Sequence, residues 1–550
     1  MKRWPVLFSA VSAVIAVMLI AGSLTPAEVA PKGHLRIALS SLGPAEKFLP
    51  WADPGCEPYI AQRIFYDFLL YSDPNTGELR PGLAERWAAE DGAKAWRFYL
   101  RKGVQFQQGY GELTAEDVKF TIERMISKES LATWGRALSR DLDRIEVVNP
   151  YEFVIRLKNP EVAFPANLLE VRCQMVIVSK KYVEAVGEAQ AAEKPVGSGP
   201  FRLVEHRRQV SARFEATVPH WRKTPGFASM TIFRVDEPAA RLAMLRAGEV
   251  DVAEIPFKLL KEAEAAGFAF ARSKGATLYH IHLGGMIDPK NQQFNPNVPW
   301  VVDPANPASA ERALKVRKAL NMAVNKKEII DAIFLGRGEP SIVPFILPGS
   351  VFVPADLKPY AFDPKQARKL LAEAGYPGGV GFPLITARLV PFPGRSEQVD
   401  VAEAVAGYWE KNLGLKIKRE VMDWAALAQK LKARNEAGII WAYGANPRPV
   451  GEPLASMTSW VPSWAMYDAM GEIPEVDRIF DAIMKEVDPK KRRLQYRDLA
   501  RYFYDNYLVV PIASVDAQYA VNPKVVDAKK WRLVIGESYI HNYEFIEPIR

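Results

Sequence analysis

The segment from Pro195 to Glu254 constrains the fold most, because it reads as turns, strands and a helix without a gap. The turn 197–200 holds two glycines and a proline and leads into an extended stretch at 201–204. Apolar and polar residues then alternate from 210 to 218, which predicts a strand with one buried face. We expect these two strands to pair as an antiparallel hairpin.

The second half of the segment predicts a strand, a helix and a further short strand. Residues 231–235 have the composition of a strand, and Asp236 stands at the expected N-cap of a helix, with Pro238 in its first turn. Gly248 is expected to end this helix, and residues 250–255 predict a strand that returns to the same sheet. This succession is typical of one lobe of an α/β protein.

Several blocks of the sequence resemble solute-binding protein family 5 of ABC importers, the periplasmic dipeptide-, oligopeptide- and nickel-binding proteins. Within the segment above, the match consists of the turn Gly197-Ser198-Gly199-Pro200-Phe201, the aromatic loop His220-Trp221 and the turn Gly248-Glu249-Val250-Asp251. Further matching blocks lie at 81–87, 96–106, 113–120, 316–330 and 363–375. The resemblance implies an α/β periplasmic-binding-protein fold of type II, the Venus-flytrap fold, with two lobes and an extra inserted subdomain.

Three of these blocks have a simple structural interpretation. We interpret 81–87 as a short helix that carries a buried Trp87, and 96–106 as an alternating strand followed by a basic turn. Thr114 is expected to cap the next helix, with Glu116 and Asp117 in the first turn, where the helix dipole favours acidic side chains. Packing alone explains these residues.

The length of 550 residues requires more than one subdomain. We assign residues 34–70, 195–275 and 508–550 to lobe I, residues 71–194 to a subdomain inserted into lobe I, and residues 276–507 to lobe II.

Residues 1–30 have the pattern of a signal peptide, with a basic start and an uncharged apolar run. That run is also long enough to cross a bilayer, so an uncleaved N-terminal anchor stays open. No cysteine lies near the expected cleavage site, which disfavours a lipoprotein. We therefore expect a periplasmic protein, either soluble or anchored at its N-terminus.

Charge and motifs narrow the function further. The net charge of +8 is spread along the chain, and the densest basic run, 490–493, has the pattern of an exposed helix start, so no nucleic-acid partner is expected. No phosphate loop, G-x-S-x-G or C-x-x-C motif is present, so neither an enzyme nor a cofactor is expected. We expect a monomeric substrate-binding protein that encloses a small solute and delivers it to ABC permease subunits. The alternative is a periplasmic chaperone or assembly factor that uses the same cleft.

Candidate ligand contacts follow the predicted strand 439–441. In peptide-binding members, the resemblance implies a turn here whose aspartate pairs with the peptide α-amino group, whereas this chain has Gly444, Ala445 and Asn446. A buried ammonium beside a neutral amide keeps most of its charge uncompensated, so we expect a peptide-like, sugar or other neutral or anionic solute. The expected cleft residues are Trp441, Tyr443, Asn446, Arg448, Trp464 and Tyr467. Core packing is the alternative for Trp464, and exposure in a proline-rich loop is the alternative for Arg448.

Two further pairs of residues leave alternatives open. His280 and His282 stand two apart on a predicted strand and share a face, so a third ligand would complete a transition-metal site; packing near the lobe junction is the favoured interpretation. Cys56 and Cys173 are the two cysteines of an exported chain and are candidates for a disulfide, while simple burial of Cys173 is the alternative.

Overall fold

The computed structural model describes residues 30–42, 46–52, 62–169, 175–392, 395, 397–447, 451–458, 460–467 and 471–549. Residues 1–29 of the predicted signal peptide, Arg448 and both cysteines lie outside these ranges. None of the described helices is long and apolar enough to cross a membrane.

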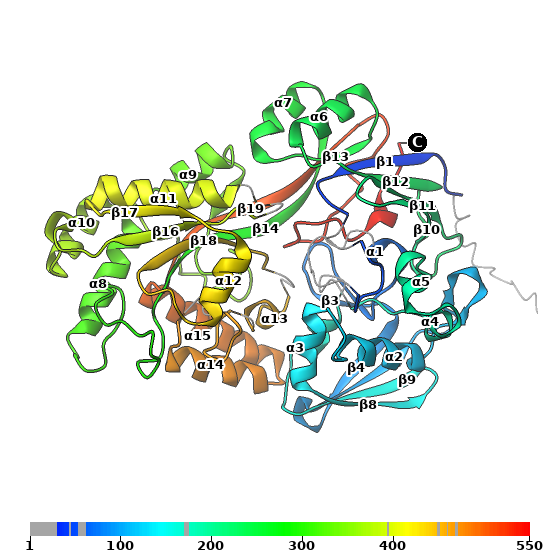
Figure 1. Cartoon of the computed structure of the whole chain (residues 1–550), viewed down its shortest axis with the longest axis horizontal. Coiled ribbons are helices and arrows are strands. Elements are labelled where there is room, and N and C mark those ends of the chain that lie inside the picture. The colour runs from blue at the N-terminus through cyan, green and yellow to red at the C-terminus, as the bar shows by residue number, and fades with distance from the viewer. Residues whose placement is uncertain are drawn as a thin grey trace, which may run out of the picture. The chain divides into compact units, whose positions relative to one another are not determined.

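An eleven-stranded sheet organises the described chain (Figure 1). Its order is β10-β11-β12-β1-β13-β19-β14-β18-β16-β17, and β15 pairs with β19 outside this path. The strands are β10 Phe201–Arg207, β11 Ser211–Ala216, β12 Ser229–Arg234, β1 His34–Leu39, β13 Val252–Glu254, β19 Val509–Val521, β14 Ala269–Leu283, β18 Ile439–Ala445, β16 Ile385–Leu389, β17 Ile417–Val421 and β15 Gly338–Pro340.

The first half of the sheet follows the pattern read from residues 195–254. β10 and β11 form the predicted antiparallel hairpin, and β1 pairs in parallel with both β12 and β13. Helix α6, Pro238–Ala247, connects β12 to β13 and ends at Gly248, which has a φ of 70°. The predicted N-cap is wrong: the cap residue is Glu237, because the Asp236 carboxylate instead accepts a hydrogen bond from Arg234 Nε at 2.8 Å.

In the second half of the sheet, the three strands β16, β17 and β18 run parallel to one another. β16 pairs in parallel with β17 and β18, and the connections are made by α11, Glu397–Leu413, and α12, Trp424–Lys432. Further helices of this half are α8 Ser309–Met322, α9 Lys326–Ile333, α10 Pro364–Glu373, α13 Leu454–Met457, α14 Pro474–Lys485 and α15 Pro489–Asn506. The side chain of Asp363 caps α10 by accepting hydrogen bonds from two backbone amides, as its Asp-Pro start predicts.

Two long strands join the halves. β14 and β19 pair with each other in antiparallel fashion; β19 also pairs with β13, and β14 also pairs with β18 (Figure 1). The sheet therefore passes from one lobe to the other through these two strands. The predicted lobe boundary between residues 275 and 276 falls inside β14, and the exact boundaries stay a prediction.

The inserted part forms its own antiparallel sheet with helices beside it. The sheet order is β4-β5-β9-β8, with bounds Ala84–Glu90, Ala95–Leu100, Glu152–Leu157 and Leu142–Asn149. The expected short helix around Trp87 is wrong: this stretch is strand β4, and Trp87 pairs with Phe98 because hydrogen bonding to β5 outweighs the local sequence preference. The Thr114 capping box of α2, Ala115–Met125, is confirmed and uses the Asp117 side chain.

The two largest clusters of buried side chains each belong mainly to one lobe, and both include residues of β14 and β19. One core contains Trp531 and Tyr543 and extends into the inserted subdomain, while the other contains Trp300 and Trp409. A chain with two cores can move its lobes about the connecting strands without unpacking either one.

Candidate functional site

A cavity of about 690 Å³ lies between the two halves of the sheet. Its described lining comes from lobe I (Ser40, Ser41, Arg234, Asp236, Pro238, Arg241, Glu254, Ile255, Pro256, Phe257), from β14 and β19 (Thr277, Tyr279, Val515, Asp516, Ala517, Gln518, Tyr519), from lobe II (Phe392, Glu397, Trp424) and from the C-terminal segment (Ser538, Tyr539). A volume of this size holds a small organic solute.

The sheet topology explains why the cavity forms here. In lobe I, the lining residues Ser40, Arg234 and Glu254 stand at or just after the carboxyl ends of parallel strands β1, β12 and β13. In lobe II, Phe392 and Trp424 follow the carboxyl ends of parallel strands β16 and β17. Ligands of open α/β sheets bind outside the carboxyl ends of the strands, and here two such edges meet across one cavity.

Arg241 stabilises the part of the cavity wall that lobe I forms. Its Nε donates to the backbone oxygen of Glu254 at 2.6 Å, and its Nη1 donates to those of Val235 at 2.6 Å and Asp236 at 3.1 Å. Burial lowers the pKa of this guanidinium. One carboxylate oxygen of Glu254 accepts from the Ser40 amide at 2.9 Å, so Arg241 holds the Glu254 backbone and Ser40 holds its side chain at the cavity wall.

The described lining carries more negative than positive charge. It holds two arginines, Arg234 and Arg241, and four acidic residues, Asp236, Glu254, Glu397 and Asp516. Arg234 is already paired with Asp236, and Arg241 uses Nε and Nη1 on backbone oxygens. The described lining therefore has an excess of two acidic side chains over basic ones.

Among the predicted site residues, Asn446 comes nearest to the cavity lining. Its Oδ1 accepts a hydrogen bond from Arg395 Nη2, and its Nδ2 donates to the hydroxyl of the lining residue Ser538 at 2.8 Å. Arg395 is buried, and the sequence analysis missed it because nothing in its loop signals a contact with a residue 51 positions later.

Three of the predicted aromatic residues, Trp441, Tyr443 and Tyr467, form one cluster with Trp460. Trp441 is 1% exposed and stacks on His282 at 4.3 Å between ring centroids. Tyr443 and Tyr467 pack against Trp460 at 4.6 and 4.8 Å. The aromatic ring of lobe II that reaches the cavity beside Phe392 is Trp424, which lies 5.9 Å from Trp460 and was not predicted as a site residue.

Trp464 lies elsewhere. Its side chain is 43% exposed, and the guanidinium of Arg140 in the inserted subdomain lies 4.7 Å from its ring centroid. None of Trp441, Tyr443, Asn446, Trp464 and Tyr467 is among the described residues that line the cavity, so their role in ligand binding stays a prediction. The sequence cues that could have found the true lining are the strand ends themselves.

His280 and His282 lie side by side, with ring centroids 4.6 Å apart. Burial lowers the pKa of His280 to about 3, so its ring is neutral, and its Nδ1 lies 3.2 Å from the oxygen of Leu278. Within the described ranges, no group of three or more His, Cys, Asp or Glu residues is arranged to hold a metal ion.

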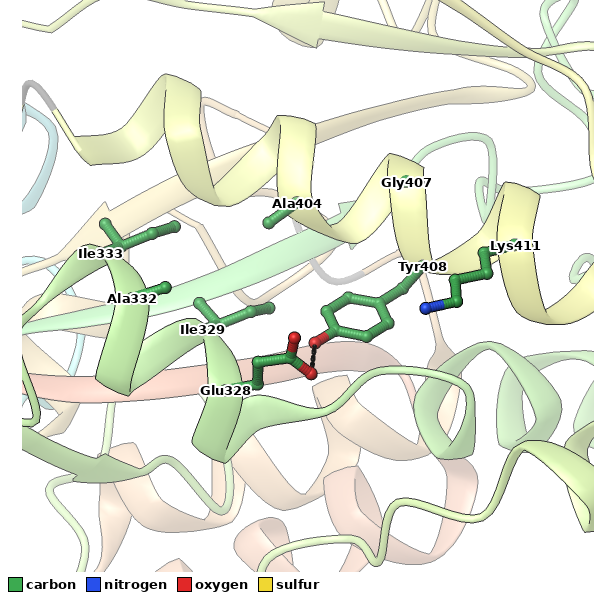
Figure 2. Close-up of a pocket in the computed structure, with 8 residues that line it drawn as sticks. All are labelled: Glu328, Ile329, Ala332, Ile333, Ala404, Gly407, Tyr408 and Lys411. Carbon is green, nitrogen blue, oxygen red and sulfur yellow. Dashed lines mark hydrogen bonds between the residues drawn. The ribbon is translucent and has the colours of Figure 1, made fainter.

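A second cavity of about 300 Å³ lies between α9 and α11 (Figure 2). Ile329, Ile333 and Ala404 form its apolar floor, and the hydroxyl of Tyr408 hydrogen bonds to Glu328 at its rim. All of its described lining belongs to lobe II, so this groove is separate from the cavity between the lobes.

The lobes also contact each other away from β14 and β19. Phe257 of lobe I packs edge to face on Phe334 of lobe II, with ring centroids 5.2 Å apart. On the side of the inserted subdomain, the Val162 amide donates to the oxygen of Met484 at 3.2 Å. Phe257 is also a lining residue, so its contact with Phe334 lies beside the cavity.

Two α/β lobes that are joined by crossover strands and enclose a cavity at their strand ends define the class of two-lobed periplasmic binding proteins. The chain belongs to the bacterial extracellular solute-binding proteins, family 5, whose middle region matches residues 78–466. It is accordingly a substrate-binding protein of the type that serves ABC importers, which confirms the predicted fold class and the main prediction of function.

Known proteins of this type cover most of the chain. Di/tripeptide-binding protein 3 of Pseudomonas aeruginosa is 27% identical over 476 residues, which are 82% of this chain and 84% of that protein. Heme-binding protein A of Haemophilus influenzae is 28% identical over 414 residues, which are 70% of each chain. The structure of HbpA2 from Haemophilus parasuis superposes with a TM-score of 0.75 at 21% identity and covers 94% of this chain and 100% of that chain.

Proposed function

We propose that the protein captures an uncharged small solute, either peptide-like or a sugar, in the 690 Å³ cavity and passes it to the permease of an ABC importer. The observation that carries this proposal is the pair of hydrogen bonds at Asn446, to Arg395 on one side and to Ser538 on the other. The similarity to a di/tripeptide-binding protein supports a peptide-like solute, and Trp424 and Phe392 supply the flat apolar surfaces that sugars and amides both use.

The contacts of Asn446 argue against an ammonium group at this place. An amide oxygen offers only a dipole, and this oxygen already accepts a hydrogen bond from a guanidinium. A second cation beside Arg395 would meet repulsion in a buried setting, where charges are weakly screened. The peptide α-amino group is therefore a poor partner for this loop.

An anionic solute is disfavoured for a different reason. The described lining holds four carboxylates and two arginines, and both arginines are engaged by protein groups. Of the neutral and anionic solutes that the sequence leaves open, the neutral ones suit this lining better.

The remaining features of the proposal concern the whole protein. It is exported by the signal peptide in residues 1–30, either cleaved or kept as an anchor, and it works in the periplasm as a monomer. It binds its solute without chemical conversion and has no nucleic-acid partner.

Calorimetry with di- and tripeptides, their N-acetylated forms, N-acetyl dipeptide amides, and mono- and disaccharides tests the proposal. We expect binding of a neutral probe, and we expect acetylation of a peptide N-terminus to leave its affinity unchanged or to raise it. Sub-micromolar binding of free peptides that disappears on acetylation would contradict the proposal. Weak binding to many denatured proteins, without any of these probes, would support a chaperone instead.

A further inference from the structure

Gln518 is a buried polar side chain of the cavity with an unused donor. It lies on β19, lines the cavity, and is 6% exposed. Its Nε2 is buried without a hydrogen-bond partner among the described residues, whereas its Oε1 accepts from Arg337 Nη1 at 3.2 Å. Buried amide donors are almost always satisfied in folded proteins, so an unpaired donor on a residue that lines the cavity is a candidate contact for a bound solute.

Arg337 fixes the orientation of that amide. An arginine donates and never accepts, so the amide oxygen must face Arg337 and the amide nitrogen must face away from it. The guanidinium also lies 5.8 Å from the ring centroid of Phe270, which restricts it further. Gln518, a lining residue of the cavity, is thereby held with its amide donor directed away from Arg337.

The same arginine connects the two lobes. Arg337 follows α9 in lobe II, and its Nη2 donates to the carboxylate of Glu264 in helix α7, Leu260–Ala265, of lobe I. The Arg337 side chain is 20% exposed and that of Glu264 is 39% exposed, so the pair lies at the edge of the molecule and not inside the cavity. A polar chain thus runs from Glu264 through Arg337 to Gln518.

On the basis of the proposed function, we propose that Gln518 Nε2 donates a hydrogen bond to an acceptor oxygen of the bound solute, and that the Glu264–Arg337 ion pair couples this contact to the arrangement of the lobes. The solute must then present a carbonyl or hydroxyl oxygen to β19. A group with donors alone, such as an ammonium, would leave the Gln518 donor unpaired, which adds a selection step independent of Asn446. Because Glu264 and Arg337 belong to different lobes, a solute that requires the oriented amide also favours the lobe arrangement in which the pair forms.

Two substitutions at Gln518 test the contact with the solute. Gln518→Leu removes the donor, and Gln518→Glu keeps the shape and the acceptor for Arg337 but turns the donor into a carboxylate oxygen. With the tightest-binding neutral probe of the calorimetric screen, we expect both variants to lose affinity about tenfold or more, while Gln429→Leu on the exposed face of α12 leaves it unchanged. Unchanged affinity in a folded Gln518→Glu variant would overturn the proposal and leave the proposed function standing, whereas no binding by the wild type would overturn both.

The coupling is tested by two glutamates of the same helix. Glu264→Gln weakens the pair with Arg337, while Glu262→Gln weakens the pair with Arg246, 2.6 Å away, which lies within lobe I. We expect Glu264→Gln to weaken binding of the same probe about threefold or more and to enlarge the ligand-free particle in small-angle scattering, and we expect Glu262→Gln to do neither. Equal behaviour of the two variants would overturn the coupling.

Discussion

Asn446 and Arg395 bring an amide and a guanidinium into direct contact where the chain leaves β18. An aspartate at this position would form an ion pair with Arg395 instead of remaining free for a ligand. The effect of the residue at position 446 on ligand selection therefore depends on Arg395, 51 positions earlier.

This pairing leads to a prediction about converting the specificity. Asn446→Asp alone is expected to leave the affinity for free dipeptides low, because Arg395 neutralises the new carboxylate. The double variant Asn446→Asp with Arg395→Met frees that carboxylate and is expected to bind free dipeptides at least tenfold more tightly than their N-acetylated forms. Calorimetry of the two variants with matched peptide pairs checks this. Equal gains in the single and double variants would show that Arg395 has no part in the selection.

The lowered pKa of the buried Lys326 leads us to expect that the stability of the protein depends on pH. Its side chain is 4% exposed, its Nζ donates to the oxygen of Asn321 at 3.2 Å, and burial lowers its pKa to about 7 from 10.5. Between these two pKa values the unfolded chain holds a proton that the folded chain has lost, so this residue makes stability rise with pH from about 7 to 10.5.

Substitution of Lys326 measures this contribution. Lys326→Met is expected to flatten the rise in unfolding free energy between pH 7 and 10, and to stabilise the protein at pH 6 by a few kcal/mol at most. The neighbouring Lys327, which is 79% exposed and paired with Asp331, serves as the control, and Lys327→Met is expected to keep the wild-type profile. Urea titrations of the three proteins across this pH range give the measurement. A profile of Lys326→Met that matches the wild type would mean that the buried ammonium keeps an ordinary pKa.

At the scale of elements, side-chain caps determine where helices of this chain begin, as at α2. The side chain of Thr114 accepts from the backbone of Asp117, and the Asp117 carboxylate accepts from the Thr114 amide at 2.9 Å. These contacts satisfy backbone amides that the first turn of α2 leaves unpaired.

Removal of the Thr114 cap is expected to lower the free energy of unfolding. Thr114→Ala is expected to lower the unfolding free energy by about 1 kcal/mol, because an amide at the start of α2 loses its partner. Glu116→Gln changes a charge in the same turn without removing the box and is expected to cost only a few tenths of a kcal/mol. Thermal unfolding followed by circular dichroism compares the two variants. A larger loss in Glu116→Gln would show that the charge in the first turn, and not the cap, stabilises the helix start.

At the scale of the whole molecule, β14 and β19 connect the two largest cores of the chain, which also touch at a few contacts such as Phe257 on Phe334. A solute in the cavity contacts lining from both lobes and so has a different affinity for open and closed arrangements. The permease of an importer of this type can then distinguish the loaded from the empty protein by its conformation.

This arrangement predicts closure on binding. With a saturating concentration of the probe that binds most tightly in the calorimetric screen, small-angle scattering is expected to give a smaller radius of gyration than without the probe. The Gln518→Glu variant under the same conditions is expected to show a smaller change, since it binds the probe more weakly. An unchanged radius for the saturated wild type would contradict the hinged mechanism.

The sequence by itself determined the elements whose causes lie within a few residues. The hairpin β10–β11 follows from the alternation at 210–218 and from the turn at 197–200 that leads into it, and the caps at Thr114 and Asp363 follow from side chains two or three positions from the amides they bind. The order of the matching blocks was also sufficient to predict the family and its fold class, because those blocks extend over most of the chain.

Only the tertiary structure decided the rest. Residues 84–90 form a strand because they pair with β5. Asp236 does not cap helix α6 because its carboxylate accepts a hydrogen bond from Arg234 instead. The cavity contacts of Trp424 and Gln518 have no local signature, since they arise where strand ends from distant parts of the chain meet. Contacts of this kind depend on packing in three dimensions, which the short-range periodicity of a sequence does not encode.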